Sequence, residues 1–160
     1  MPAVPNPSPT ADRELSLSRL LDAPRELVFD AWTDPAHMTQ WWGPNGFTTK
    51  VYQMDVKPGG TCRFLLTGPD GTQYPSRFTY REVKRPERLM YRHGSDVDDD
   101  PNAFEVTVTF EAQGQKTLLT MRSVLPTVEA CEHVKSFGAV ELGHQTLAKL
   151  DAFVQRALAR

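Results

Sequence analysis

The residues of this sequence best suited to acid–base chemistry are Glu82 and His93. Both lie in alternating runs that predict β-strands, and the alternation places both side chains on the inward face of a sheet. A buried carboxylate near an imidazole has the shifted pKa values that proton transfer needs. A structural ion pair is the commoner outcome, because Lys84 and Arg85 follow at the strand end. The pattern favours binding over catalysis without excluding an enzyme, and it assigns no catalytic residue.

Three aspartates have the spacing of a metal-binding loop. Asp96, Asp98 and Asp100 begin like a calcium loop. However, Pro101 stands where such a loop needs glycine, and Thr107 stands where it needs a bidentate glutamate. We therefore expect a solvated acidic loop here, with no metal.

The remaining histidines and the two cysteines indicate no further site. His133 and His144 would lie about 16 Å apart on a continuous helix, too far to share one ion. Cys62 and Cys131 form neither a disulfide framework nor a Cys-x-x-Cys pair, which indicates a reducing cytoplasm. Motifs of serine hydrolases and of phosphate- or dinucleotide-binding loops are absent, so we expect no cofactor.

Composition narrows the choice of partners. The chain has 160 residues, with 18 Lys+Arg against 20 Asp+Glu and a net charge of −2. This balance gives no basic face for nucleic acid. No run approaches the roughly 18 apolar residues of a membrane-spanning helix, and the N-terminus lacks an apolar signal segment. We expect a cytoplasmic protein with a flexible proline-rich tail over residues 1–11 and a single domain over residues 12–160.

The first elements follow from periodicity and from the positions of prolines. Alternating leucines over residues 14–21 predict a half-buried strand. Pro24 and Pro35 each begin a short helix after it, and Gly43-Pro44 ends the second helix. From residue 47 to 124, runs rich in Val, Thr, Phe and Tyr alternate with Gly/Pro turns, which predicts antiparallel strands. These strands are expected near 47–56, 61–67, 73–83, 88–94, 103–112 and 116–124.

A helical region follows Pro126, with a break near Gly138 and a long final helix over residues 139–159. This helix has one apolar stripe, which must lie on the sheet. A mid-helix glycine, Gly143, lies in the stripe and costs about 1 kcal/mol relative to alanine. Either a strand packs closely there or a ligand needs the space, and both interpretations stay open. The stripe consists of Val140, Gly143, Leu147, Leu150, Val154 and Leu158.

Short segments spread over about residues 14–158 have the residues and spacing of a known family. They are Asp22 to Phe29, Ala31 to Pro35, Trp41 to Pro44, Gly46-Phe47, Asp55 to Gly60, Gly68 to Gly71, Glu82-Val83 with Pro86 to Leu89, and Val106 to Phe110. Together they resemble the family of activators of heat-shock protein 90 ATPase homologues, within the START-like (SRPBCC) superfamily. The resemblance implies an α+β helix-grip (Bet v 1-like) fold. In this fold a curved seven-stranded antiparallel sheet surrounds the C-terminal helix, and two short helices follow the first strand.

Two stretches depart from the family pattern. His93 stands where relatives often have an aromatic residue, and the stretch from Gly138 to Gly143 lacks the usual aromatic. Both positions are expected to face the cavity that the resemblance implies. The ligand preference of relatives is therefore not transferred to this chain.

Alternation within the strands predicts which residues face that cavity. The expected lining is apolar with a few polar points, which is typical of a ligand pocket and also of an ordinary core. One of the two adjacent tryptophans is expected to close the open side of the sheet and the other to face an entrance or a partner. The expected lining residues are Trp41, Trp42, Phe64, Leu66, Phe78, Tyr80, Glu82, Tyr91, His93, Val106, Val108, Met121, Gly143, Leu147 and Leu150.

The leading hypothesis is a domain that binds a small hydrophobic or aromatic molecule, with little or no catalysis. One alternative is a protein-interaction module that regulates a chaperone ATPase, as the family name implies. A second is a polyketide-cyclase-like enzyme that uses Glu82 or His93. Exposure of Trp41 and Trp42 would also support a homodimer, since apolar patches rarely face water in monomers.

Overall fold

The computed structural model describes residues 9–159, and its elements follow the predicted order. A 3-10 turn at Ala11–Arg13 precedes the first strand, so regular structure begins slightly before the predicted domain boundary. Residues 1–8 of the predicted tail lie outside the described residues. The elements are β1 (Glu14–Leu21), α1 (Arg25–Thr33), α2 (Pro35–Trp41), β2 (Thr48–Met54), β3 (Thr61–Thr67), β4 (Gln73–Lys84), β5 (Arg88–Ser95), β6 (Phe104–Gln113), β7 (Lys116–Val124), α3 (Val128–Ser136) and α4 (Ala139–Leu158).

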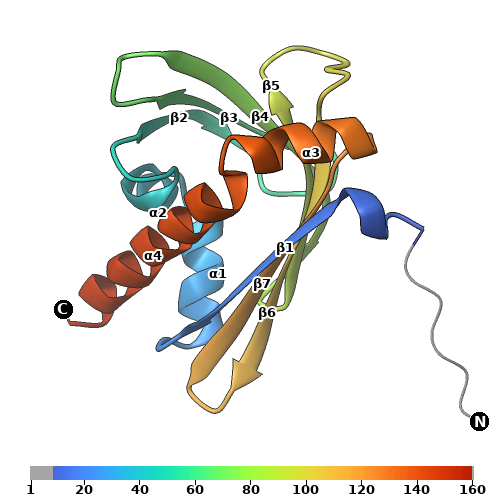
Figure 1. The fold of residues 1–160 in the computed structure, drawn as a ribbon. Helices are drawn as coiled ribbons and strands as arrows, with labels where there is room; N and C mark the ends of the chain where they lie inside the picture. The colour runs from blue at the N-terminus through green and yellow to red at the C-terminus, as the bar shows by residue number, and fades with distance from the viewer. Residues whose placement is uncertain (1–8, 160) are drawn as a thin grey trace, which may run out of the picture.

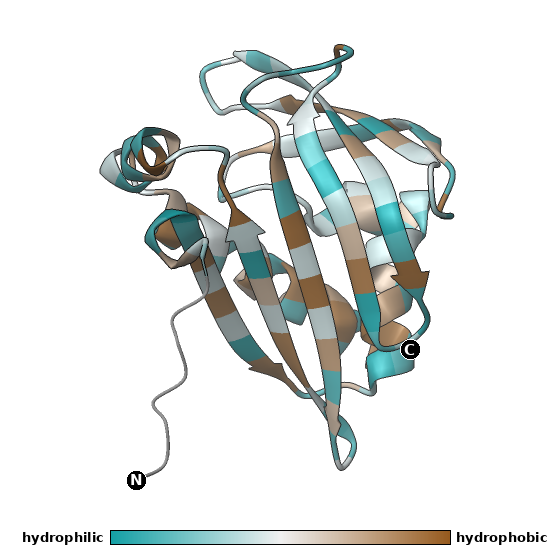
Figure 2. Cartoon of the chain, turned by 90° about the vertical axis from the view of Figure 1, so that its right-hand side faces the viewer, coloured by the Kyte–Doolittle hydropathy of each residue, from teal (hydrophilic) through white to brown (hydrophobic). Residues whose placement is uncertain are grey.

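One antiparallel sheet contains all seven strands, in the order β1-β7-β6-β5-β4-β3-β2. The sheet curves, and α4 crosses its hollow side next to α1 and α2 (Figure 1). Hydrophobic and hydrophilic bands alternate along the strands (Figure 2), as expected for a sheet with one face buried. These features confirm the predicted α+β helix-grip fold. None of the helices within residues 9–159 is both long and apolar enough to cross a membrane.

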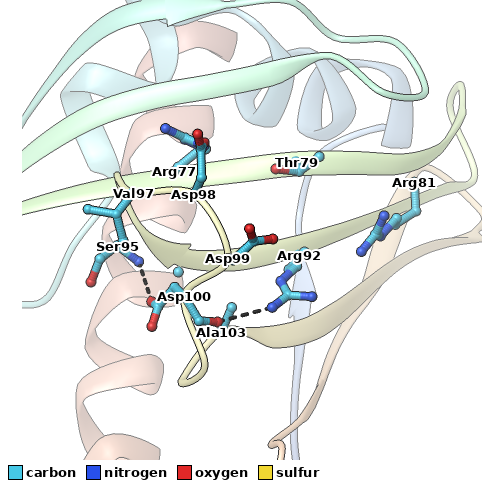
Figure 3. Close-up of a pocket in the computed structure, with 11 residues that line it drawn as sticks. Arg77, Thr79, Arg81, Arg92, Ser95, Val97, Asp98, Asp99, Asp100 and Ala103 are labelled. Atoms are coloured by element: carbon cyan, nitrogen blue, oxygen red, sulfur yellow. Dashed lines mark hydrogen bonds and ion pairs between the residues drawn. The ribbon is translucent and has the colours of Figure 1, made fainter.

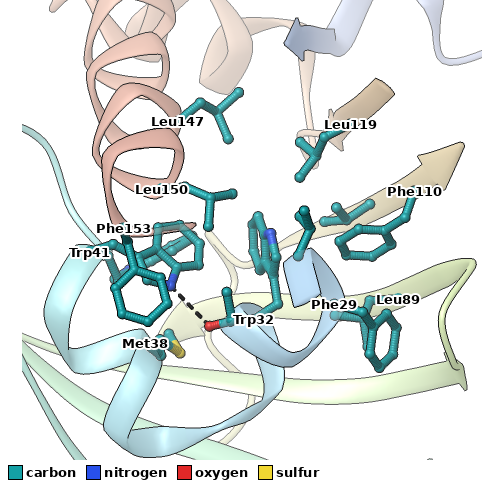
Figure 4. Close-up of a cluster of buried hydrophobic side chains, with 14 of the residues drawn as sticks. Phe29, Trp32, Met38, Trp41, Leu89, Phe110, Leu119, Leu147, Leu150 and Phe153 are labelled. Atoms are coloured by element: carbon teal, nitrogen blue, oxygen red, sulfur yellow. Dashed lines mark hydrogen bonds between the residues drawn. The ribbon is translucent and has the colours of Figure 1, made fainter. Parts of the chain in front are cut away.

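All three tryptophans belong to the buried core cluster, and Figure 4 shows Trp32 and Trp41 within it. Trp32 on α1 packs edge-to-face against Trp41 at 4.9 Å and against Trp42 at 5.4 Å between ring centroids. The Nε1 of Trp41 donates a hydrogen bond of 2.9 Å to the carbonyl of Ala31. Asp34 caps α2 by accepting from the backbone N–H of Ala36, which turns α2 back onto α1.

This packing corrects the expectation of an exposed aromatic surface at the end of α2. Trp41 is 0 % exposed and Trp42 is 7 % exposed. Both rings face inward because α2 folds onto α1. The argument for a homodimer through these two residues is therefore wrong.

Candidate functional site

An apolar cavity of about 260 Å³ lies between the sheet and the junction of α3 with α4; we call it the inner cavity. Its walls come from β1 and β7 on one side and from the end of α3 and the first turns of α4 on the other. Among the described residues, no Asp, Glu, Lys or Arg lines it. The lining residues are Leu15, Leu17, Trp42, Pro44, His93, Phe104, Met121, Ser123, Leu125, Val134, Phe137, Ala139, Val140, Leu142, Gly143 and Thr146.

The two halves of α4 differ in their packing, and this difference leaves room for the cavity. Leu147, Leu150 and Val154 in the second half are buried in the core. In the first half Val140 is 40 % exposed, and Gly143 is where the helix touches β1. A Cβ added to Gly143 would lie 2.3 Å from the Cδ1 of Leu17. Close packing of helix on strand therefore explains the mid-helix glycine, and that contact forms one edge of the inner cavity.

His93, near the end of β5, is the titratable residue in the cavity wall. Its ring lies 4.8 Å from that of Phe78, 4.9 Å from Phe104 and 6.2 Å from Trp42. Burial lowers the pKa of His93 to about 4, against a smaller upward effect of the Asp100 carboxylate. The imidazole is therefore neutral at neutral pH. Within the described chain its Nδ1 is buried without a hydrogen-bond partner.

A wider hollow of about 800 Å³ adjoins the inner cavity; we call it the outer vestibule. It is formed by the start of β4, the end of β5 and the loop that follows β5. His93, Phe104 and Phe137 line both hollows and so form the boundary between them. Phe137 is 57 % exposed and precedes Gly138, which has a φ of 86° at the break between α3 and α4. Phe137 therefore lies, more than half exposed, where the two hollows meet.

The structure brings only part of the predicted lining to these hollows. Trp42, His93, Met121 and Gly143 line the inner cavity, and Leu66 lines the outer vestibule together with His93. The other apolar residues of the predicted set face inward as expected but are packed in the solid core. These core residues are Trp41, Phe64, Phe78, Tyr80, Tyr91, Val106, Val108, Leu147 and Leu150.

Glu82 does not face inward, which corrects the predicted orientation. A β-bulge shifts the pairing of β4 with β5 after Tyr80, so Glu82 pairs with Met90 and Val83 takes the inward place. The Glu82 carboxylate accepts two hydrogen bonds from Arg88, at 3.0 and 3.1 Å. These bonds lower the pKa of Glu82. Glu82 is also four residues along β4 from the residue that pairs with His93, about 13 Å, so the two form no acid–base pair.

Several lining residues were missed by the sequence prediction. Leu15, Leu17 and Val140 had been assigned to inward faces by their periodicity, but without a role in the cavity. Ser123 shares the face of Met121 by alternation but was not named, and Phe137 carried no periodic signal. Phe137 could have been identified from its place next to the predicted helix break at Gly138. Two helices separate at such a break, and a residue there can border the space between them.

The opposite face of the sheet has a polar groove of about 400 Å³ beside the loop after β5 (Figure 3). Its arginines are paired within the chain. Arg77 binds Asp96 at 2.9 Å and Asp98 at 2.7 Å, and Arg92 donates to the carbonyl of Asp100 at 3.0 Å. The side chain of Asp96 is only 11 % exposed. The loop is exposed at Val97 and Asp98, as expected of a solvated loop, but the ion pairs of Asp96 anchor it to the sheet.

No group of three or more His, Cys, Asp or Glu in residues 9–159 is arranged to hold a metal ion. The chemistry of the inner cavity therefore comes from its shape, its apolar wall and the imidazole of His93.

A curved antiparallel sheet gripping a long helix over an apolar cavity defines a domain of the helix-grip class. Residues 22–155 match the model of the family described as Activator of Hsp90 ATPase homolog 1-like protein, and the chain belongs to this family. The resemblance inferred from the sequence segments is thereby confirmed. A comparison with curated protein sequences found no match.

Solved structures of bacterial proteins have the same fold. A protein from Arthrobacter aurescens is 22 % identical, with a TM-score of 0.85 over 94 % of this chain and 90 % of its own. A protein from Nitrosomonas europaea is 20 % identical, with a TM-score of 0.84 over 94 % and 99 % of the two chains. One from Rhodobacter sphaeroides is 22 % identical, with a TM-score of 0.81 over 93 % and 97 %. At these identities the likeness establishes the fold alone.

Proposed function

We propose that this protein binds a small, mainly apolar molecule in the inner cavity and acts as a binding protein. The observation that carries the proposal is an apolar hollow next to a densely packed core, with no charged side chain in its described lining. Its volume of about 260 Å³ is slightly below the roughly 300–1,000 Å³ of pockets for drug-sized ligands. The ligand class this favours is a compact molecule of one or two rings.

The expected affinity follows from the apolar surface that such a ligand would bury. Removing about 200 Å² of ligand surface from water contributes roughly 5 kcal/mol, before the loss of translational and rotational freedom. A dissociation constant no tighter than about 0.2 mM is therefore expected from this burial alone. A tighter natural ligand would need a specific polar contact in addition.

Tetralin, a two-ring hydrocarbon, is a suitable probe, and a cavity-filling variant supplies the test. Ser123→Phe places a ring in the inner cavity from β7, whereas Thr120→Phe adds the same ring on the other face of the same strand, where Thr120 meets Ser18 at 3.2 Å. Titration followed by tryptophan fluorescence should show tetralin binding to the wild type and to Thr120→Phe, with Ser123→Phe weakened at least about tenfold. Absence of tetralin binding to the wild type, or equal binding by all three proteins, contradicts the proposal.

A protein-interaction role is the second candidate, and the family description favours it, since it names an activator of the Hsp90 ATPase. Stimulation of the ATPase of the cognate chaperone, together with a pull-down, tests it directly. The Ser123→Phe variant separates the two roles, because filling the cavity should leave a surface interaction unchanged. A null result in both assays at high concentration counts against a chaperone role.

Catalysis of the cyclase type is not part of the proposal. With Glu82 paired to Arg88, His93 has no carboxylate beside it within the inner-cavity lining. An imidazole with a pKa of about 4 is also a weak base.

We also propose that the protein works in the cytoplasm. Cys62 and Cys131 are both free and buried, which supports a reducing compartment.

A further inference from the structure

Four residues of the inner cavity have side chains with an N–H or O–H group: Trp42, His93, Ser123 and Thr146. The hydroxyl of Thr146 already donates to the carbonyl of Leu142, at 3.1 Å. His93 differs from the other three because it also lines the outer vestibule, where its ring is surrounded by aromatic rings. It is therefore the polar group best placed to distinguish ligands of similar shape.

The surroundings of His93 indicate which ring nitrogen carries the proton. Nδ1 is buried, and no described residue donates to it or accepts from it. An N–H buried without an acceptor is rarer in proteins than an under-used acceptor, so Nδ1 is best understood as the unprotonated nitrogen. The neutral ring then carries its proton on Nε2. Nε2, unlike Nδ1, is not among the buried side-chain atoms without a partner in the described chain, so Nε2 is the ring nitrogen open to a ligand.

We propose that the Nε2–H of His93 is the polar recognition group of the inner cavity, and that the preferred ligand is a compact apolar ring bearing a neutral hydrogen-bond acceptor, such as a ketone oxygen. This inference rests on the proposed ligand-binding function and specifies its ligand class. A carboxylate is disfavoured, since no Lys or Arg is among the described lining residues to balance its charge. A pure hydrocarbon fits the shape but leaves the N–H without a partner.

A matched pair of probes isolates the contact. Tetralin and 1-tetralone share one carbon skeleton and differ by a ketone oxygen. The quantity to measure is the ratio of their dissociation constants in wild type and in His93→Phe, which keeps an aromatic ring among Phe78, Phe104 and Trp42 but removes the donor. One neutral hydrogen bond predicts that the wild-type preference for 1-tetralone exceeds that of His93→Phe by about three- to tenfold.

Two further measurements make the outcome decisive. His93→Gln, which restores an N–H donor, should recover part of the preference for 1-tetralone. Nitrogen NMR of the unliganded wild type at neutral pH should show His93 protonated on Nε2. If the ratio of the tetralin and 1-tetralone dissociation constants is the same in wild type and in His93→Phe, the inference is overturned, but the binding function is not. An imidazole of His93 protonated on Nδ1 would overturn the inference in the same way. If tetralin and 1-tetralone both fail to bind the wild type, the binding function itself fails, and this inference fails with it.

Discussion

The Cδ1 of Leu17 lies 2.3 Å from where an alanine at position 143 would place its Cβ. The clashing atom is the end of a flexible side chain that borders the inner cavity, so Leu17 can rotate into that space. Gly143→Ala gains about 1 kcal/mol of helix propensity, which offsets the cost of the rotation. We expect the free energy of unfolding to change by less than about 1 kcal/mol, while tetralin binding weakens several-fold because the cavity is smaller.

Combining Gly143→Ala with Leu17→Ala tests the mechanism. The double variant removes the displaced side chain, so the affinity for tetralin should return towards that of the wild type. The two substitutions should be non-additive in a thermodynamic cycle, as expected for residues in contact. Urea unfolding and fluorescence titration provide the two readouts. Unchanged affinity in the single variant would show that Leu17 does not move into the cavity.

Phe137 lies at the boundary between the outer vestibule and the inner cavity. Removing its ring with Phe137→Ala should open this boundary and raise both the association and the dissociation rates of tetralin by roughly three- to tenfold. The equilibrium affinity should change less, because most of the lining is untouched. Val128→Ala is the control, as Val128 is 38 % exposed on the same helix and lines neither hollow. Stopped-flow fluorescence measures both rates, and a change confined to the dissociation rate would argue for a simple loss of contact.

The sequence predicted the strands well because each run alternates and each turn contains Gly or Pro. The orientation of Glu82 was predicted wrongly because a one-residue β-bulge moves every later side chain of the strand to the opposite face of the sheet. No local sequence pattern indicates such an insertion. The anchoring of the acidic loop through Asp96 was missed for a different reason. The arginines that bind Asp96, Arg63 and Arg77, lie on two other strands, and only strand register brings them to it.

The position of the cavity could not be predicted from periodicity. The alternating pattern places both Phe64 and Met121 on the inward face of the sheet. However, Phe64 is buried in the core, whereas Met121 borders the inner cavity. What separates them is the distance of α4 from the sheet, which depends on the break at Gly138 and on the contact of Gly143 with Leu17. That distance is a tertiary property.

Comparing Asp96 with Asp98 measures how much the ion pairs in the loop after β5 contribute to the free energy of unfolding. Asp96 is 11 % exposed and bonds to both Arg63 and Arg77, whereas Asp98 is 89 % exposed and bonds to Arg77 alone. The bonds from Arg63, and then those from Arg77, lower the pKa of Asp96. We expect Asp96→Asn to lower the free energy of unfolding at pH 7 by about 2 kcal/mol and Asp98→Asn by less than about 0.5 kcal/mol. If urea unfolding shows the same loss of stability for both variants, the burial of Asp96 does not strengthen its ion pairs.

His93 should make stability depend on pH below neutrality. Its pKa is about 4 in the folded protein and about 6.5 when unfolded, so between these values the unfolded chain binds the proton first. The stabilising effect of the neutral ring is complete above about pH 6.5 and is lost as the pH falls towards 4. The total loss is about 3 kcal/mol. Asp100, the carboxylate acting on this ring, reduces the effect.

The comparison of wild type with His93→Phe isolates this contribution. Urea unfolding from pH 7 to pH 4 should show stability falling faster in the wild type than in the variant. The carboxylates whose pKa values are lowered, such as Asp96 and Asp100, are present in both proteins and cancel in the difference. Parallel curves over this range would show that the imidazole is already charged or solvated in the folded state.

The hydroxyl of Tyr91 is a buried polar group without a hydrogen-bond partner in the described chain. The residue is 0 % exposed and its ring stacks on Phe78 at 4.1 Å, so Tyr91→Phe keeps the packing and removes only the oxygen. Because an unsatisfied buried hydroxyl costs roughly 1–3 kcal/mol, the substitution should raise the free energy of unfolding by about 1 kcal/mol. Tyr52→Phe, at a side chain 55 % exposed, should have almost no effect. Destabilisation by Tyr91→Phe would instead indicate an ordered water bonded to this hydroxyl, which would add a polar point to the core.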